Sequence, residues 1–252
     1  MSVQRIVVAS LALLSLPCVA ANGAETLATL LATVSEAARP ATPLRADAAA
    51  ELNGLEGRKR DHLVFVERSA GAHGPPQVYV QLDEAKIRVL ALDPSDLRIA
   101  REGKVEKVAA DAAVGSTSFT VEDFLPFSPA RCAATRLAEI TAEQFALVCE
   151  PKKPPSQYSL MVYKFDREKS ALLQVLLYKG AMTNLVKMLR NADFVQVGGT
   201  WRPKRVVMQD FKLRTRDVLS LQWQAVAQLP SEAFDPTAFA AIVLPKAPFA
   251  KP

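Results

Sequence analysis

The sequence predicts a mainly β domain of the α+β class, in which an antiparallel sheet curls into a barrel or half-barrel. The first observation is that roughly ten short runs with apolar residues at alternate positions follow one another at near-regular spacing. Strands joined by short turns pair antiparallel, and a long meander of such strands curls. The second observation is that helical patterns occur before and after this series. No change in composition divides the chain into two domains.

The first residues match a secretory signal peptide. Residues 1–5 carry one positive charge, the run IVVASLALLSL is apolar or small, and the run VAA supplies the small residues that leader peptidase requires. The apolar run is too short to span the ~30 Å of a bilayer comfortably. We therefore predict a signal peptide over residues 1–21, cleaved near Ala20 and Ala21, followed by one domain over residues 22–252.

The mature chain begins with a helical pattern. Leu27, Leu30, Leu31 and Val34 recur at helical spacing within residues 26–38, which predicts one helix with a single apolar face. The next segment, PLRADAAAEL, fits a strand or a helix. We interpret it as a strand because alternating runs follow it.

Alternating runs predict the strands of the sheet. They occupy residues 62–69, 77–82, 86–92, 97–100, 104–110, 135–140, 145–150, 159–166, 171–179, 201–210 and 218–228. The run TNLVKMLRN is ambiguous and is interpreted as a further strand, and Gly198-Gly199 marks a turn. A short closing helix begins at Pro236, because proline is favoured in a first helical turn.

The cysteines predict one disulfide. After cleavage only Cys132 and Cys149 remain, and an even number in an exported chain favours a bridge. Folding the two flanking runs as a hairpin places these cysteines opposite each other. Such a bridge closes a loop of about sixteen residues and contributes roughly 3 kcal/mol; the alternative is two buried thiols. A lipid anchor on Cys18 stays open, although Pro17 disfavours that processing.

Signals for catalysis are few. The two histidines, His62 and His73, have no serine or cysteine nucleophile motif beside them, and no metal motif, nucleophile elbow or P-loop is present. Glu122 and Asp123 are neighbours, so on a strand they would point to opposite faces; we interpret them as solvated acids in a turn. We therefore expect no enzyme, no cofactor and no metal. A hydrolase dependent on His62 or Asp123 is the remote alternative.

Two strands require cover on a second face. The runs SLMVYKFD and ALLQVLLYK are apolar on both faces, whereas one face of an antiparallel sheet normally meets water. The N-terminal helix can cover part of that surface, and a bound apolar ligand can cover the rest. A curved single-layer sheet of this kind favours a hydrophobic cleft.

The charge of the chain is mildly positive. The formal net charge is +5, and loss of Arg5 with the signal peptide leaves 30 basic and 26 acidic residues, or +4. This charge suits the anionic head groups of a membrane surface without requiring them. Basic and aromatic residues do not interleave, so nucleic acid is not expected as a partner.

Four segments carry a resemblance to a known family. They are GSTSFTVEDF, YSLMVYKFDREKSALLQVLLYKG, GTWRP followed by VVMQD, and LPSEAFDPTAF. In order and spacing they resemble the periplasmic outer-membrane lipoprotein-sorting proteins, which are similar in fold to the lipoprotein carrier LolA. The resemblance covers residues 115–239. Thr117 and Val121 depart from the aspartate and tyrosine of the family's first block.

The resemblance implies an open antiparallel half-barrel whose N-terminal helix and short C-terminal helix cover the concave face. It implies a monomeric periplasmic carrier that holds acyl chains of lipids or lipoproteins, with an inner-membrane transporter or an outer-membrane acceptor as partner. On this reading GSTSFTVEDF is structural: its hydroxyls satisfy backbone groups, and Phe119 and Phe124 face the apolar side. The alternative is a non-carrier periplasmic binding module, either a sensor or an accessory subunit of an inner-membrane transporter or regulator.

Alternation along the strands selects candidate lipid-binding residues. A register error of one residue would exchange the faces of any one strand. The candidates are Val78, Val80, Leu82, Val89, Phe119, Met161, Tyr163, Phe165, Leu173, Val175, Leu177, Met208, Leu221 and Trp223.

Overall fold

A computed structural model describes residues 26–54, 57–71, 75–181 and 183–246. The predicted signal peptide over residues 1–21, with its cleavage site and Cys18, lies outside the described residues, and so does His73.

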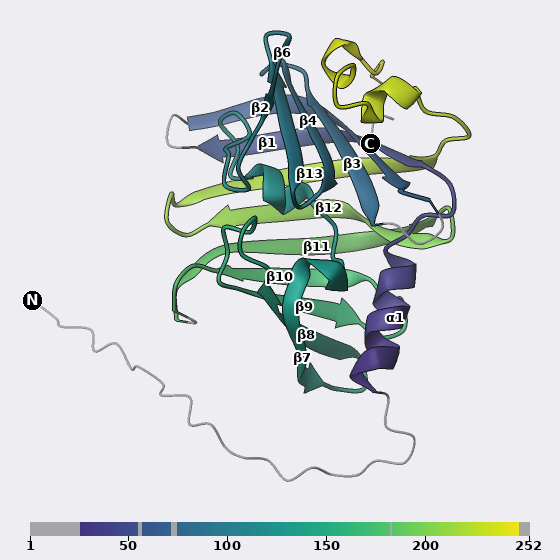
Figure 1. Cartoon of the computed structure of the whole chain (residues 1–252), viewed down its shortest axis with the longest axis vertical. Coiled ribbons are helices and arrows are strands. Elements are labelled where there is room, and N and C mark those ends of the chain that lie inside the picture. Colours follow the sequence, from purple (N-terminus) through teal and green to yellow (C-terminus); the bar gives the residue numbers. More distant parts are fainter. Residues whose placement is uncertain (1–25, 55–56, 72–74, 182, 247–252) are drawn as a thin grey trace, which may run out of the picture.

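Thirteen strands in the described residues form one unclosed antiparallel sheet. Their order is β6-β5-β4-β3-β2-β1-β13-β12-β11-β10-β9-β8-β7, and the sheet curves into an open half-barrel (Figure 1), which confirms the predicted fold class. The bounds are β1 Leu44–Gly54, β2 Gly57–Ser69, β3 Pro76–Leu82, β4 Ile87–Asp93, β5 Asp96–Arg101, β6 Lys104–Lys107, β7 Cys132–Ile140, β8 Gln144–Pro151, β9 Leu160–Asp166, β10 Leu172–Tyr178, β11 Leu185–Val197, β12 Thr200–Asp210 and β13 Thr215–Ala225.

The two ambiguous segments are both strands. PLRADAAAEL forms β1, which lies at the centre of the sheet between β2 and β13, and TNLVKMLRN lies at the start of β11. The described residues therefore contain thirteen strands rather than the roughly ten expected. At the predicted Gly198-Gly199 turn both glycines have positive φ, and a Cβ on Gly198 would lie 2.9 Å from Leu44 Cδ2, so this turn requires glycine.

The N-terminal helix, α1 (Leu27–Ala37), forms as predicted. Thr26 caps it by accepting a hydrogen bond from the Thr29 backbone amide. Leu30 and Val34 are its buried residues and pack against the inner faces of β8, β9 and β10. In Figure 1 the helix lies against the lower half of the sheet, where it covers part of the concave face.

The C-terminal segment differs from the prediction in shape and in place. It forms two short 3-10 turns, η3 (Ser231–Phe234) and η4 (Phe239–Ala241), instead of one helix. Phe234 and Phe239 pack with Tyr79, whereas Val78 and Val80 on the same strand belong to the concave-face core. Neighbouring residues of a strand point to opposite faces, so this segment covers the outer face of β2–β5 and not the concave face. Because β3 is buried on both faces, it requires this second cover.

Residues 108–131, called here the crossing loop, connect the two edges of the sheet. The loop leaves edge strand β6, runs across the concave face and enters the opposite edge strand β7 (Figure 1). It contains two 3-10 turns, η1 (Val121–Phe124) and η2 (Pro129–Arg131). Just after it, the predicted disulfide between Cys132 and Cys149 is confirmed and joins β7 to β8.

Candidate functional site

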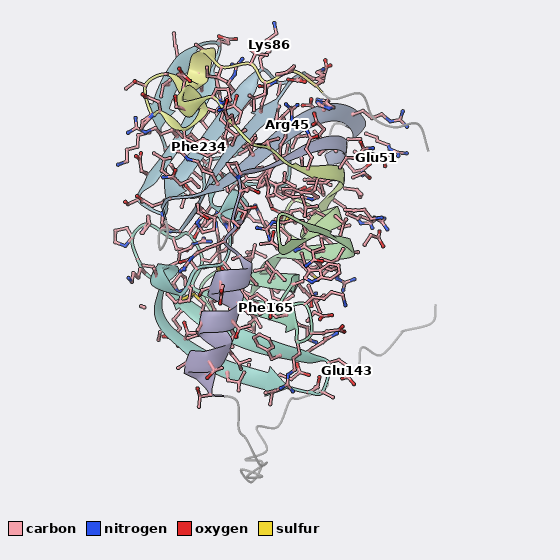
Figure 2. All side chains as sticks on the ribbon, turned by 90° about the vertical axis from the view of Figure 1, so that its right-hand side faces the viewer. Arg45, Glu51, Lys86, Glu143, Phe165 and Phe234 are labelled. Carbon is pink, nitrogen blue, oxygen red and sulfur yellow. A yellow bond between two sulfur atoms is a disulfide. The ribbon has the colours of Figure 1, made fainter. Side chains whose placement is uncertain are left out.

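A cavity of about 200 Å³ lies on the concave face, bounded by α1, the crossing loop and the inner side of the sheet and open to solvent on part of its surface. Figure 2 shows Phe165, one of its wall residues, beside α1. Most of the wall is apolar because inward positions of the strands alternate with outward polar ones. The apolar wall includes Val34, Ala37, Leu63, Phe65, Phe119, Phe124, Leu125, Phe127, Phe165, Leu172, Leu189, Phe194, Trp201, Val206, Leu219, Leu221 and Trp223.

Four of the predicted lipid-binding residues line this cavity, namely Phe119, Phe165, Leu221 and Trp223. Nine others lie on the same concave face but are packed into the two cores beside the cavity. The core around β1–β5 takes Val78, Val80, Leu82, Val89 and Met208, and the core under α1 takes Met161, Tyr163, Val175 and Leu177.

Leu173 is placed differently from its neighbours. The pairing between β9 and β10 shifts between Leu172 and Gln174, and Leu172 rather than Leu173 contributes to the cavity wall. A shift of one residue exchanges the two faces of a strand, and alternation alone does not reveal it.

Sequence reasoning also missed wall residues on β2 and α1. Leu63 and Phe65 alternate with Val64 and Val66 in HLVFVERS. The alternation identifies the two pairs, but it does not show which pair points to the concave face. The helical stripe of α1 contained Val34, but Ala37 carried no signal because a single alanine fits any face.

The crossing loop is fixed to the sheet by buried carboxylates. Asp123 Oδ2 lies 2.8 Å from Lys187 Nζ on β11, and the Tyr158 hydroxyl donates to Asp123 Oδ1 at 2.6 Å. Thr120 donates its amide and its hydroxyl to the same carboxylate. Burial, together with the negative charge of Asp123, raises the pKa of Tyr158, so this phenol stays a neutral donor.

Glu122 is also buried. Its carboxylate lies 3.3 Å from Arg131 Nη2 and accepts the Gln157 amide at 3.0 Å. Arg131 donates as well to the Leu125 carbonyl at 3.0 Å, within the loop itself. The interpretation of Glu122 and Asp123 as solvated acids was therefore wrong: each is paired with a cation and hydrogen-bonded, which is how buried charges are accommodated.

A third carboxylate holds the loop from β13. Asp217 is fully buried and accepts the backbone amides of Ser118 and of Asn53, while Ser118 Oγ lies 2.8 Å from Thr215 Oγ1. Burial raises the pKa of Asp217, and the hydrogen bonds from Ser118 oppose that rise.

The structural interpretation of GSTSFTVEDF is confirmed. Thr117 Oγ1 donates to the Val114 carbonyl at 2.7 Å, so a hydroxyl satisfies the backbone of the bend. The rings of Phe119 and Phe124 stack at 5.1 Å within the apolar core.

One end of the cavity is polar. Arg202 on β12 donates to both oxygens of Glu67 on β2, at 3.0 and 3.2 Å, and to the Ala38 carbonyl that follows α1. Burial raises the pKa of Glu67, and Arg202 opposes that rise. Lys169 lies at this end as well, 3.5 Å from Asp166 Oδ2 and 5.7 Å from the centre of the Trp201 ring.

The arrangement suits enclosure of an apolar ligand. In the part of the chain that the structure describes, no group of three or more His, Cys, Asp or Glu is placed to hold a metal ion. His62 lies on β2 and contacts Asp83 at 3.3 Å, on the side of the sheet opposite the cavity. The described residues include no helix with the length and apolar character needed to cross a bilayer.

Comparisons by sequence identify one family model. A family model described as "Uncharacterized protein" matches residues 100–240. No curated protein matches the chain by sequence.

Three solved structures share the fold over most of their length. A putative outer membrane lipoprotein-sorting protein domain from Vibrio parahaemolyticus is 13% identical with a TM-score of 0.73, over 84% of this chain and 97% of that one. A DUF1329 family protein from Desulfovibrio piger is 14% identical with a TM-score of 0.68, over 82% and 94%. A LolA superfamily protein from Nitrosomonas europaea is 15% identical with a TM-score of 0.64, over 84% and 98%.

Proposed function

The chain belongs to the family whose model matches residues 100–240, and it has the fold of the lipoprotein-sorting and LolA-superfamily structures. From these premises we propose that the protein is a periplasmic carrier or chaperone for acyl chains of lipids or lipoproteins. The observation that carries the proposal is the apolar cavity on the concave face. An acyl chain in water costs about 0.8 kcal/mol for each exposed CH₂ group, so a carrier must offer an apolar lining.

Release of the cargo requires a wall that can move, and α1 is the wall best suited to this role. Leu30 and Val34 are its only fully buried residues within Leu27–Ala37. Burial of each such side chain contributes about 1.5–3 kcal/mol, so the helix is docked by a few kcal/mol. The crossing loop, in contrast, is anchored to the rest of the domain by three buried carboxylates, those of Asp123, Glu122 and Asp217. Segments with few buried contacts open first.

The proposal includes an export route and partners. Residues 1–21 serve as a cleaved signal peptide, and residues 22–252 form one binding domain that works in the periplasm. One structural neighbour is described as a putative outer membrane lipoprotein-sorting protein domain, which supports transport towards the outer membrane. An inner-membrane transporter would load such a carrier, and an outer-membrane acceptor would unload it.

Native mass spectrometry of protein isolated from periplasm tests the proposal. We expect co-purified phospholipid or acylated peptide, and uptake of a fluorescent fatty acid by the delipidated protein. Leu189→Glu places a charge in the cavity wall and should abolish uptake, whereas Met188→Glu is its matched control. The two residues are neighbours on β11 and both are half-buried, but only Leu189 lines the cavity.

Two outcomes would overturn this function. Protein that is repeatedly empty and takes up no fatty acid would contradict it, and so would equal loss of uptake in both variants. A stable protein partner recovered without any lipid would instead support the sensor or accessory subunit.

A further inference from the structure

The size of the cavity limits how much apolar ligand it holds. Its volume is about 200 Å³. A dry apolar cavity of about 150 Å³ accommodates benzene, which has six carbons, so this cavity has room for roughly eight carbons. It is smaller than the ~300–1,000 Å³ typical of pockets for drug-sized ligands. Two or three acyl chains side by side do not fit in it.

The crossing loop prevents the cavity from widening on one side. Displacing the loop would separate Asp123 from Lys187, Glu122 from Gln157 and the Ser118 amide from Asp217. Loss of the first contact would leave Lys187 and Asp123 as buried unpaired charges, and loss of the other two would remove hydrogen bonds from the buried carboxylates of Glu122 and Asp217, all of which are unfavourable. The space between the loop and β1–β5 is already filled by Phe119, Phe124 and Leu125.

The helix fills the other side. Leu30 and Val34 pack with Phe145 and Tyr163 in the core under α1, and Arg202 holds the Ala38 carbonyl at the end of the helix. A second chain would have to displace this core. While α1 stays docked as in this structure, the cavity therefore has room for one chain between α1 and the loop.

Among the described residues at the polar end of the cavity, Lys169 is a cation with unused donors. Arg202 is engaged by Glu67, by the Ala38 carbonyl and by the Trp201 carbonyl. The ammonium group of Lys169 has three donors; in the described part of the chain its one carboxylate contact is Asp166 at 3.5 Å, and it also lies 5.7 Å from the centre of the Trp201 ring. Its side chain lines the cavity and is 32% exposed, so it reaches both the cavity and solvent.

We propose that the cavity binds an amphiphile with a single acyl chain, about eight carbons of which lie inside, and that Lys169 contacts an anionic group at the end of that chain. A fatty acid and a lysophospholipid share this chemistry. The inference rests on the proposed function and narrows its cargo to one chain per protein.

Calorimetric titration of the delipidated mature protein tests the number of chains. The ligands are fatty acids of increasing length, dodecanol, lysophosphatidylglycerol, diacyl phosphatidylglycerol and a triacylated lipopeptide. We expect one single-chain anionic ligand per protein, bound at least tenfold more tightly than the diacyl lipid with the same head group. The relative affinities of the fatty acid and the lysophospholipid identify which source is preferred.

Two pairs of variants test the residues. Lys169→Gln should lower the affinity for anionic single-chain ligands about tenfold and leave the affinity for dodecanol unchanged. Lys164→Gln is its control, since Lys164 is 34% exposed and paired with Glu139 at 3.7 Å, but lies on the outer face of β9. Ala37→Leu narrows the cavity and should lower the affinity for all single-chain ligands. Ala28→Leu, on the exposed side of α1, should leave these affinities unchanged.

The outcomes separate this inference from the function on which it rests. If the diacyl lipid binds one-to-one with the same affinity as the single-chain lipid, or if Lys169→Gln and Lys164→Gln have equal effects, the proposal of a single-chain anionic ligand is wrong. The proposed carrier function would still stand. If none of the ligands binds, both proposals fail.

Discussion

Lys187 Nζ lies 2.8 Å from Asp123 Oδ2, and this buried ion pair joins the crossing loop to β11 across the hollow of the half-barrel. The side chains are 8% and 1% exposed, so water hardly screens the pair. The Tyr158 hydroxyl donates to the other carboxylate oxygen. As a result, the loop is part of the core, and α1 is the only wall of the cavity in the described residues without a buried ion pair of its own.

Asp123→Asn should lower the free energy of unfolding by about 3–5 kcal/mol, because it leaves the Lys187 ammonium buried without its counter-charge. Urea unfolding at neutral pH measures the loss. Adding Lys187→Met should recover part of it. The matched control is Glu139→Gln, since Glu139 pairs with Lys164 at the surface, where a pair contributes less than about 1 kcal/mol. Similar losses in the two single variants would contradict this account of the loop.

Replacing both Cys132 and Cys149 by alanine should lower stability by about 3 kcal/mol, as expected for a bridge across a loop of this length. The sequence separation is 17, and the bridge joins the edge strand β7 to β8. Reduced wild-type protein should unfold at the same urea concentration as the double variant. An unchanged midpoint after reduction would show that the bridge contributes nothing.

The sheet could be predicted from sequence because its information is local. Each strand carries its own alternating pattern, and the connection of neighbouring strands by short turns determines their antiparallel order. The fold class therefore followed from the runs between residues 43 and 228. The disulfide followed for the same reason, because Cys132 and Cys149 lie in one hairpin.

The site was less predictable because its contacts are distant in sequence. Asp123 and Lys187 are 64 residues apart, Ser118 and Asp217 are 99 apart, and Glu67 and Arg202 are 135 apart. An acidic residue in a polar run gives no local sign of such a partner, so the buried acids were interpreted as solvated.

The prediction that the C-terminal segment covers the concave face was wrong for a related reason. β3 is buried on both faces, and a strand of this kind offers two apolar surfaces for one short C-terminal segment. Alternation shows that two surfaces exist, but the segment that covers each is decided by packing. The crossing loop fills the inner surface, which leaves the outer surface of β2–β5 for residues 229–246.

Phe239→Ala should release this C-terminal segment. Phe239 is fully buried between the segment and the outer face of the sheet, and removal of such a ring costs about 3–5 kcal/mol. Limited proteolysis should then cut between residues 229 and 246 before the rest of the chain unfolds. Phe211→Ala is the matched control, because Phe211 is 37% exposed and should change stability little. Equal cleavage of the two variants would show that Phe239 does not hold the segment.

Alkaline pH should weaken the same contact through Tyr79. The Tyr79 hydroxyl is buried and donates to the Ile242 carbonyl at 3.0 Å, and burial raises the pKa of Tyr79 from 10.0 to about 12, against the opposing effect of Arg88. A raised pKa means that the unfolded chain loses this proton first. The stability contribution is therefore complete below pH 10 and is lost as the pH rises through about 12.

The predicted loss is at most about 3 kcal/mol, since one pKa unit corresponds to ~1.36 kcal/mol. Urea unfolding of wild type and Tyr79→Phe between pH 9 and pH 12 isolates the contribution of Tyr79, because the other groups that lose protons at alkaline pH are the same in both proteins. We expect wild type to be the more stable protein near pH 9, since the phenylalanine variant lacks the donor to Ile242, and the difference to shrink as the pH rises. Parallel curves over this range would mean that the Tyr79 proton is not linked to folding.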